Sequence, residues 1–302
     1  MALTYPEAVV VGLVQGVTEL FPVSSLGHSV LIPALIGGRW ARDLNVSAPE
    51  SPYLAFIVGL HVATAVALIV FFRRDWVRII RGLLTSVRRR RVSTPDERLA
   101  WLIILATIPV GLAGLLLEHT FRTVLGRPAP AAAFLIVNGF LLLLSERLRR
   151  TALERVPVEA GSVPGRRLEV YADRRLAVLS VPSTLFIGSA QILALLPGIS
   201  RSGAAMAGGL VRGLDHEDAA RFSFLLATPV ILAAGVLKLP DLAGPLGAGI
   251  HGQVLAGSLV SGLGAYASVR WLTRWFTTRT LTPFAIYCLL AGGVSLFALA
   301  VR

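Results

Sequence analysis

The chain has 302 residues, of which 55% are hydrophobic and 15% charged, and its formal net charge is +12. Soluble domains usually carry about 25% charged residues, so this composition excludes a soluble globular protein and predicts an integral membrane protein. The positive charge does not indicate nucleic-acid binding, because the arginines gather in loops between apolar stretches, as in the cytoplasmic loops of membrane proteins.

The first apolar stretch, about residues 8–36, contains a polar string that runs from Gln15 to His28. Glu19 lies within this string, among Gly, Pro and Ser residues. An ionisable side chain at membrane depth is costly enough to be a functional-site hypothesis by default. A second apolar stretch, about residues 177–211, contains a similar polar string that includes Arg201.

Six further stretches are long and apolar enough to span a bilayer, or nearly so. They are residues 53–72, 99–117, 131–145, 219–237, 250–269 and 281–301. Three of them follow each polar string, and both strings contain a Pro-x-x-Ser frame, Pro22 to Ser25 and Pro197 to Ser200. Broken apolar segments at corresponding positions of two halves indicate an inverted repeat.

We therefore predict an all-α polytopic membrane protein, an inverted repeat with two re-entrant helix pairs plus six transmembrane helices. The first repeat is residues 1–150, with its re-entrant pair at about 8–36. The second repeat is residues 177–302, with its pair at about 177–211. The polar segment 151–176 is predicted to be a cytoplasmic linker between the repeats.

The charges of the loops predict the orientation of the chain. Loop 73–98 has nine Arg against three acidic residues and loop 146–176 has eight against five, whereas 37–52 has two against two. Cytoplasmic loops carry the excess of Lys and Arg, so we expect the first two loops inside and both termini outside. The run Arg88 to Arg91 is interpreted as part of this topology signal, and binding of anionic lipid headgroups is the alternative.

The two strings predict an anion site. Pro22 and the Pro197-Gly198 pair should break their helices, and serine side chains can then cap the helices that follow. The serines in question are Ser24, Ser25, Ser200 and Ser202. Unpaired N–H groups and the dipole at a helix N-terminus attract anions, and Arg201 adds a forked donor that matches phosphate oxygens.

Gln15 and Glu19 lie four residues apart, on one helical face. Glu19 beside an anion site is expected to hold a divalent cation, or to act as a base or orienting group. His28 should reach the Ser25 hydroxyl or the leaving oxygen, and a hydroxyl beside a base is the minimal activated nucleophile. Close helix packing for Ser24 and Ser202 and a proton relay for Glu19 are alternatives.

Two further polar residues are given structural interpretations. His61 lies between two apolar runs and is interpreted as a packing residue. Gln191 precedes the second string much as Gln15 precedes the first, and it is expected to hydrogen-bond the broken backbone.

Three motifs resemble those of the undecaprenyl-pyrophosphate phosphatase family of the bacitracin-resistance type. They are Gln15-x-x-x-Glu19, Pro-Val-Ser-Ser-x-Gly-His from Pro22 to His28, and Pro-Gly-x-Ser-Arg-Ser from Pro197 to Ser202. The segment from Ala220 to Leu226 also resembles the family. The likeness covers nearly the whole chain.

The resemblance implies an enzyme of the bacterial inner (plasma) membrane that removes one phosphate from undecaprenyl pyrophosphate, with its site facing outside. It implies a divalent cation, Mg²⁺ or Ca²⁺, and a polyprenyl pyrophosphate lipid as partner. The catalytic roles fall on Glu19, Ser25, His28 and Arg201, with Glu19 also the metal candidate. Substrate binding falls on Gln15, Ser24, Gly198, Ser200 and Ser202. A homodimer is left open.

The chain departs from the family at Gln15, which is often Glu, and at Leu26 and Ala205, which are usually Thr. These departures put the number of bound cations in question. A transporter or flippase of undecaprenyl phosphate is the alternative function, because transporters also use inverted repeats with broken helices. The combination of Glu19, Ser25, His28 and Arg201 favours hydrolysis, since a carrier needs no nucleophile.

Overall fold

The computed structural model describes residues 3–44, 52–153, 175–244 and 247–301, and within these ranges every element is a helix. The first half contains α1 (Tyr5–Thr18), α2 (Ser25–Ile36), α3 (Gly38–Asp43), α4 (Pro52–Phe71), α5 (Arg73–Arg89), α6 (Pro95–Leu125) and α7 (Pro128–Leu153). The second half contains α9 (Val181–Ala190), η1 (Gln191–Leu195), α10 (Arg201–Val211), α11 (His216–Ala243), α12 (His251–Trp275) and α13 (Thr282–Ala300). Most of the predicted linker, 154–174, lies outside the described residues.

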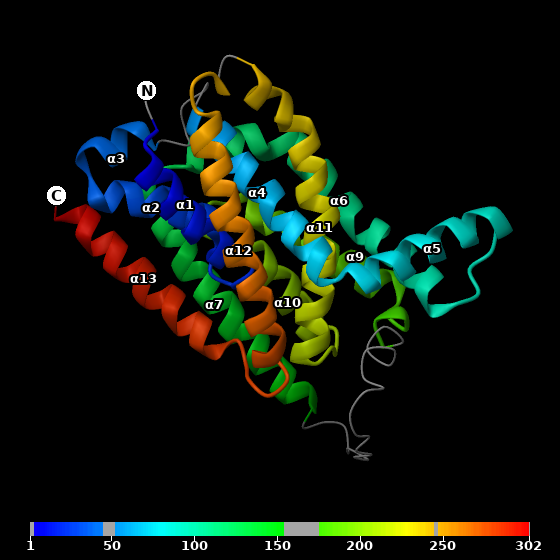
Figure 1. The fold of residues 1–302 in the computed structure, drawn as a ribbon. Helices are drawn as coiled ribbons and strands as arrows, with labels where there is room; N and C mark the ends of the chain where they lie inside the picture. Colours follow the sequence, from blue (N-terminus) through cyan, green and yellow to red (C-terminus); the bar gives the residue numbers. More distant parts are fainter. Residues whose placement is uncertain (1–2, 45–51, 154–174, 245–246, 302) are drawn as a thin grey trace.

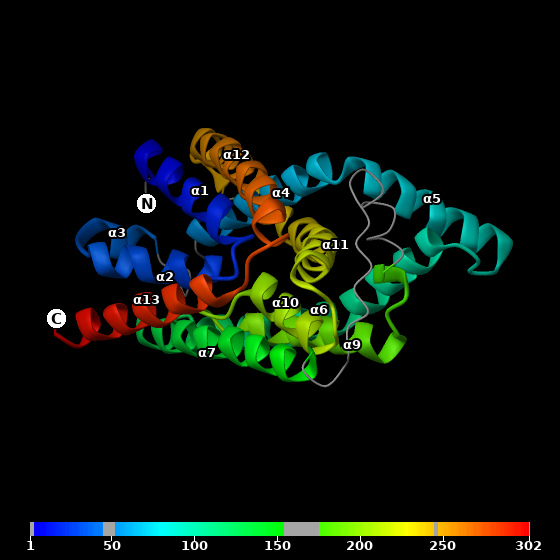
Figure 2. The ribbon, with the colours of Figure 1, turned by 90° about the horizontal axis from the view of Figure 1, so that it is seen from below.

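The long helices form a bundle in which the two halves of the chain are intermixed (Figures 1 and 2). α13 packs along α7, α12 lies against both α1 and α4, and α11 packs on α4. α9 packs against α6, and α10 lies between α7 and α11. The two predicted polar strings fall at helix breaks inside this bundle, between α1 and α2 and between η1 and α10. The prediction that both strings interrupt their helices is therefore confirmed.

Four helical segments are long and apolar enough to cross a membrane: Pro95–Leu117, Pro128–Thr151, His216–Leu237 and Thr282–Ala300. α4 qualifies only together with α5, to which it is joined at a bend of 86°. Helices cover all six predicted spans, but four or five candidates are found among the described residues, so the count of six is not confirmed. A multi-pass, all-helical membrane protein is the class that the helices define.

Residues 73–98 are not simply a loop. Most of this segment forms α5 and the first turn of α6. Apolar residues recur every three or four positions between its arginines, which is the pattern of an amphipathic helix. The arginine content predicts a loop here, and that prediction is wrong for most of the segment, since charged residues are compatible with a helix.

Glycines allow α1 and α12 to approach closely. A Cβ added to Gly12 would lie 2.4 Å from the Gly257 carbonyl oxygen, and one added to Gly16 would lie 2.3 Å from that of Ser261. Without water to hydrogen-bond exposed backbone, small residues at such contacts let membrane helices pack by van der Waals attraction. This contact fixes the C-terminal end of α1, where the polar string begins.

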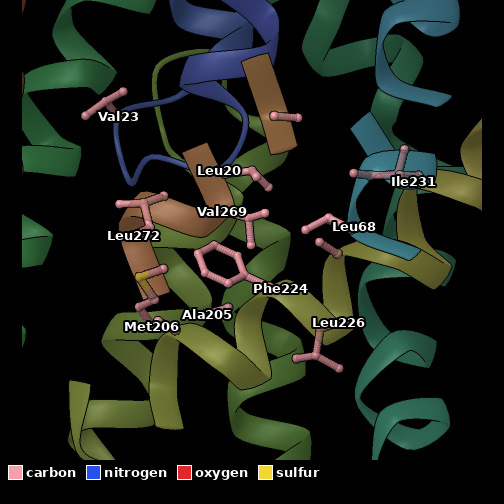
Figure 3. Close-up of a cluster of buried hydrophobic side chains, with 14 of the residues drawn as sticks. Leu20, Val23, Leu68, Ala205, Met206, Phe224, Leu226, Ile231, Val269 and Leu272 are labelled. Carbon is pink, nitrogen blue, oxygen red and sulfur yellow. The ribbon is translucent and has the colours of Figure 1, made fainter. Parts of the chain in front are cut away.

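A cluster of buried apolar side chains lies beside the first helix break (Figure 3). Leu20, Phe224 and Leu272 are fully buried in it, and Met206 is almost as inaccessible. These residues come from the first break, α11, α10 and α12. Close packing of this kind resists displacement, so the cluster gives the irregular backbone at the break a rigid support.

Candidate active site

The first break begins where α1 ends at Thr18 and finishes where α2 begins at Ser25. Glu19 caps the C-terminus of α1 through its N–H bond to the Gln15 carbonyl, at 3.0 Å. Ser24 is the N-cap of α2, and its hydroxyl accepts a hydrogen bond from the Gly27 N–H at 3.2 Å. Ser24 has a φ of +69°, which is uncommon for a residue with a side chain and is typical of strained functional segments.

The second break lies between Leu195 and Arg201. Gly198 has a φ of +113°, and an added Cβ there would lie 2.3 Å from the Ala131 carbonyl oxygen. Only glycine satisfies both conditions. Ser200 is the N-cap of α10 and accepts a hydrogen bond from the Gly203 N–H at 3.1 Å. Of the four serines predicted as caps, Ser24 and Ser200 are the caps, whereas the hydroxyls of Ser25 and Ser202 donate to Glu19 and to the Phe21 carbonyl.

The two breaks are in contact with each other. An added Cβ on Gly27 would lie 3.0 Å from the Cα of Gly198. The hydroxyls of Ser200 and Ser202 lie 2.9 Å apart and both donate to the Phe21 carbonyl, at 3.3 and 3.1 Å. Both of these serines therefore join the second break to the backbone of the first.

Asn138 of α7 completes this junction. Its Nδ2 donates to the Pro22 carbonyl at 2.9 Å, and its Oδ1 accepts from the Ser200 N–H at 3.0 Å. The side chain is fully buried. Sequence analysis did not single out Asn138, although an amide within the apolar stretch 131–145 was a signal of the same kind as Glu19.

The Glu19 carboxylate is the centre of the site, and its side chain is 5% exposed. Arg201 Nη2 donates to Oε1 at 2.7 Å. Oε2 accepts from the Ser25 hydroxyl at 2.5 Å and from Gln15 Nε2 at 3.0 Å. The structure therefore brings together four predicted residues from the two polar strings, which are far apart in the sequence.

His61 of α4 also reaches this carboxylate. Its Nε2 lies 3.3 Å from Glu19 Oε2, while its Nδ1 lies 2.9 Å from the Ile57 carbonyl. The interpretation of His61 as a packing residue is wrong, because its ring forms part of the polar cluster. The sequence could not reveal which helix faces the first break.

Two polar atoms of the cluster are buried without a hydrogen-bond partner: Gln15 Oε1 and Arg201 Nη1. Buried polar groups are nearly always hydrogen-bonded, and an unpaired one is costly. The free Nη1 suits an anionic oxygen, and the free Oε1 suits a donor or a cation. The two unpaired atoms thus favour a ligand that has both an anionic oxygen and a donor or cation, such as a phosphate with a counter-cation.

His28 has partners other than the one expected. Its Nδ1 lies 2.7 Å from the Ser24 carbonyl, and its Nε2 lies 2.7 Å from the hydroxyl of Tyr287. Its ring also stacks on Tyr287, at 5.7 Å between centroids. Ser25 is instead paired with Glu19, so the base beside this hydroxyl in the structure is the carboxylate. Tyr287 of α13 was not foreseen, because a tyrosine in an apolar span gives no distinctive signal.

Gln191 corrects a second expectation. Its side chain is fully buried, yet neither Oε1 nor Nε2 has a hydrogen-bond partner. It does not hydrogen-bond the broken backbone as expected.

No group of three or more His, Cys, Asp or Glu residues lies together in the part of the chain that the structure describes. Glu19 and His61 are a pair, and Gln15 adds one neutral oxygen. Mg²⁺ is usually bound by one or two carboxylates together with substrate phosphates. The residues present therefore fit a cation that arrives with a phosphate ligand better than one held by the protein alone.

These features define a polytopic membrane protein whose broken helices build a buried site for an anion. A model of the family described as bacitracin resistance protein BacA matches residues 8–294. The chain belongs to this family.

Named relatives agree with this assignment. The chain is 67% identical to a protein of Mycolicibacterium paratuberculosis named undecaprenyl-diphosphatase, over 99% of each chain. It is 55% identical to undecaprenyl-diphosphatase 1 of Frankia casuarinae, over 97% of each. It is 45% identical to undecaprenyl-diphosphatase 2 of Chromobacterium violaceum, over 96% of this chain and 97% of the relative.

Proposed function

We propose that the protein hydrolyses undecaprenyl pyrophosphate to undecaprenyl phosphate and phosphate, which recycles the carrier lipid for cell-wall synthesis. The observation that carries the proposal is the Ser25 hydroxyl 2.5 Å from a buried carboxylate, which is itself paired with Arg201. The names of the relatives, at 45–67% identity over nearly the whole chain, support the same reaction.

Ser25 is the proposed nucleophile. Its Oγ would form a bond to the terminal phosphorus while the bridging P–O bond breaks, and the hydroxyl proton would pass to Glu19 Oε2. Undecaprenyl phosphate leaves, and water then cleaves the phosphoserine to release phosphate. A hydroxyl within hydrogen-bond reach of a base is the arrangement that such a step requires.

Arg201 has two functions in this proposal. Nη2 orients Glu19, and the unpaired Nη1 binds a phosphate oxygen. The N-termini of α2 and α10 add backbone N–H groups at the same place. Charge that develops on the phosphoryl oxygens is therefore met by donors that are already in position.

His28 and Tyr287 are proposed to serve the leaving group. Their hydrogen-bonded pair lies one helical turn after Ser24, and Tyr287 is 45% exposed. Nδ1 is held on the Ser24 carbonyl, so a protonated His28 would give its Nε2 proton to the oxygen of the departing group, which takes the place of the Tyr287 hydroxyl. Asn138, Ser200 and Ser202 act as positioning residues that hold the two breaks together.

The divalent cation implied by the resemblance, Mg²⁺ or Ca²⁺, stays a proposal. Glu19 and the unpaired Gln15 Oε1 are the oxygen ligands that the chain offers. When bound, the cation would neutralise part of the pyrophosphate charge.

We further propose that the fold is the predicted inverted repeat. If α1, α4, α6 and α7 correspond to α9, α11, α12 and α13, the contact of α1 with α12 corresponds to that of α9 with α6. Under the same correspondence, the contact of α12 with α4 corresponds to the contact of α6 with α11. All four of these helix contacts are present. The pairs α1–α2 and α9/η1–α10 would then be the re-entrant segments.

The orientation is part of the same proposal. With the basic loops inside, the N-terminus of α1 and the C-terminus of α13 lie outside. The site then opens to the outer face of the bacterial inner membrane. The homodimer stays a prediction that a single chain does not test. The flippase alternative finds no support among the named relatives.

The direct test is phosphate release from undecaprenyl pyrophosphate by the purified protein in detergent, with Mg²⁺, with Ca²⁺ and with a chelator. We expect wild-type protein to release one phosphate per lipid. Protein that binds the lipid but releases no phosphate under any of these conditions would contradict the proposal and favour a carrier.

A further inference from the structure

α5 projects from the bundle, alongside the start of α6 (Figures 1 and 2). It follows α4 after a bend of 86°. The Trp101 indole N–H of α6 donates to the Ser86 hydroxyl of α5 at 2.9 Å. An added Cβ on Gly82 would lie 2.9 Å from the backbone of Glu97. One side of α5 is therefore fixed against α6.

The rest of α5 is divided into two exposed faces. Val77, Ile80, Leu84 and Val87 are 46%, 50%, 65% and 57% exposed. They are three or four positions apart and so form one apolar face. A neighbouring face carries the exposed arginines Arg74, Arg81 and Arg88.

Acidic residues do not neutralise this arginine face. Asp75, the acidic residue of α5, is buried and pairs with Arg78 at 2.6 Å and with Arg221 of α11 at 2.9 Å. Among the ion pairs found in the described residues, none involves Arg74, Arg81 or Arg88. α5 thus presents apolar surface and unneutralised positive charge side by side.

Both ends of α5 are attached to apolar helices. α4 ends at Phe71, directly before α5, and the candidate span of α6 begins at Pro95, soon after it. A helix that links the ends of two apolar helices, and runs at 86° to one of them, lies along a membrane surface if those helices cross the membrane. That placement is where an amphipathic helix with an arginine face is stable.

We infer that α5 lies in the membrane interface and binds anionic lipid headgroups. Its apolar face, Val77, Ile80, Leu84 and Val87, enters the boundary of the acyl chains, and its arginine face binds the phosphates of the same leaflet. Anionic lipids attract basic segments near the surface, and arginine stems pack on apolar surface while the guanidinium reaches the headgroups. The Arg88 to Arg91 run therefore takes part in headgroup binding in addition to setting the orientation of the chain.

The first experiment measures how deeply α5 is immersed. Leu84→Cys and Arg81→Cys are each made with Cys288→Ser, since Cys288 is the single cysteine, and each is labelled with a fluorophore in phosphatidylglycerol-containing proteoliposomes. We expect lipids brominated in their acyl chains to quench the label at 84 several-fold more than the label at 81. Aqueous iodide should quench the label at 81 more.

Two outcomes would overturn the inference. A label at 84 that iodide quenches as well as the label at 81 would mean that the apolar face meets water. A label at 84 that neither quencher reaches would mean that protein covers this face, as in a contact with a second copy or a soluble partner.

The second experiment tests the charge. Arg81→Gln with Arg88→Gln is compared with wild type and with Arg42→Gln, an exposed arginine of α3 used as a matched control. Phosphatidylglycerol retained on the purified protein is measured against phosphatidylcholine. One surface arginine is worth about fivefold in binding, so the double variant should lose most of the preference at low salt. Equal retention by all three proteins would overturn the headgroup assignment.

Discussion

At the scale of single residues, Glu19 organises the site because its two oxygens face different partners. Oε1 is held by Arg201, and Oε2 accepts from Ser25 and Gln15. A buried carboxylate is tolerated only when it is paired and hydrogen-bonded. The requirement that makes Glu19 stable in an apolar region thus also places a base beside a hydroxyl.

Ser25→Ala should abolish phosphate release while the lipid still binds. The substitution removes the proposed attacking oxygen but leaves Arg201 and both helix N-termini in place. We expect a loss of at least about a hundredfold in turnover, and Glu19→Gln added to it should cost little more, because residues of one catalytic unit are strongly non-additive. Phosphate release and lipid binding are measured on the same preparations. Full activity of Ser25→Ala would mean that Ser200 or a water molecule, and not Ser25, attacks the phosphorus.

Arg201→Lys should lose most of its turnover although the charge is kept. Lysine is a point charge and cannot bind Glu19 and a phosphate oxygen through two fixed nitrogens. One preorganised donor aimed at developing charge is worth about 3–4 kcal/mol, so kcat should fall about a hundredfold to a thousandfold. Steady-state phosphate release over a range of lipid concentrations gives kcat and KM for both proteins. A variant with near-normal kcat and a raised KM would mean that Arg201 only attracts the anionic lipid and does not stabilise the transition state.

The sequence predicted Glu19, Ser25 and Arg201 because polar residues within apolar stretches are rare enough to be noticed singly. It did not predict His61, Asn138 or Tyr287, each of which comes from a helix that reaches the breaks only through the fold. A single sequence carries no signal for which faces of α4, α7 and α13 point inward. The partner of His28 was missed for the same reason.

At the scale of elements, the breaks depend on backbone shapes that Pro and Gly permit. Pro22 and the Pro197-Gly198 pair predicted where helices stop, and the adjacent serines predicted where they start again. The contact between the two breaks was not predictable, since it depends on Gly27 and Gly198 meeting. α5 was missed as a helix because its arginines dominated the interpretation.

Gly198→Ala should reduce both stability and turnover, whereas Gly213→Ala is a matched control. Both glycines have positive φ, +113° and +88°, but a Cβ at Gly198 meets the Ala131 carbonyl and one at Gly213 meets nothing within 4 Å. Strain alone costs roughly 1–2 kcal/mol, so the control should lower the melting temperature slightly and keep activity. Gly198→Ala should lower both markedly. Equal effects of the two substitutions would mean that the close approach at Gly198 is unimportant.

At the scale of the whole molecule, the pairing of helices from opposite halves connects topology with the site. α1 packs on α12 and α9 on α6, so each broken segment is supported by a helix of the other half. Neither contact leaves room for a side chain, because a Cβ added to Gly16 would lie 2.3 Å from the Ser261 carbonyl oxygen and one added to Gly188 would lie 2.2 Å from that of Ala106. An inverted repeat would place the two helix N-termini face to face in this way.

Cysteine labelling in intact cells tests that arrangement, with Cys288→Ser as background. The exposed position Arg42 precedes α4 and the exposed His251 begins α12, whereas the exposed Arg89 ends α5 and the exposed Arg279 follows α12. If α4 crosses the membrane once and the basic loops are inside, cysteines at 42 and 251 should react with an impermeant maleimide. Those at 89 and 279 should react only after the cells are opened. Reaction of 42 and 279 from the same side would contradict the inverted repeat, because it requires a different number of crossings between the two halves.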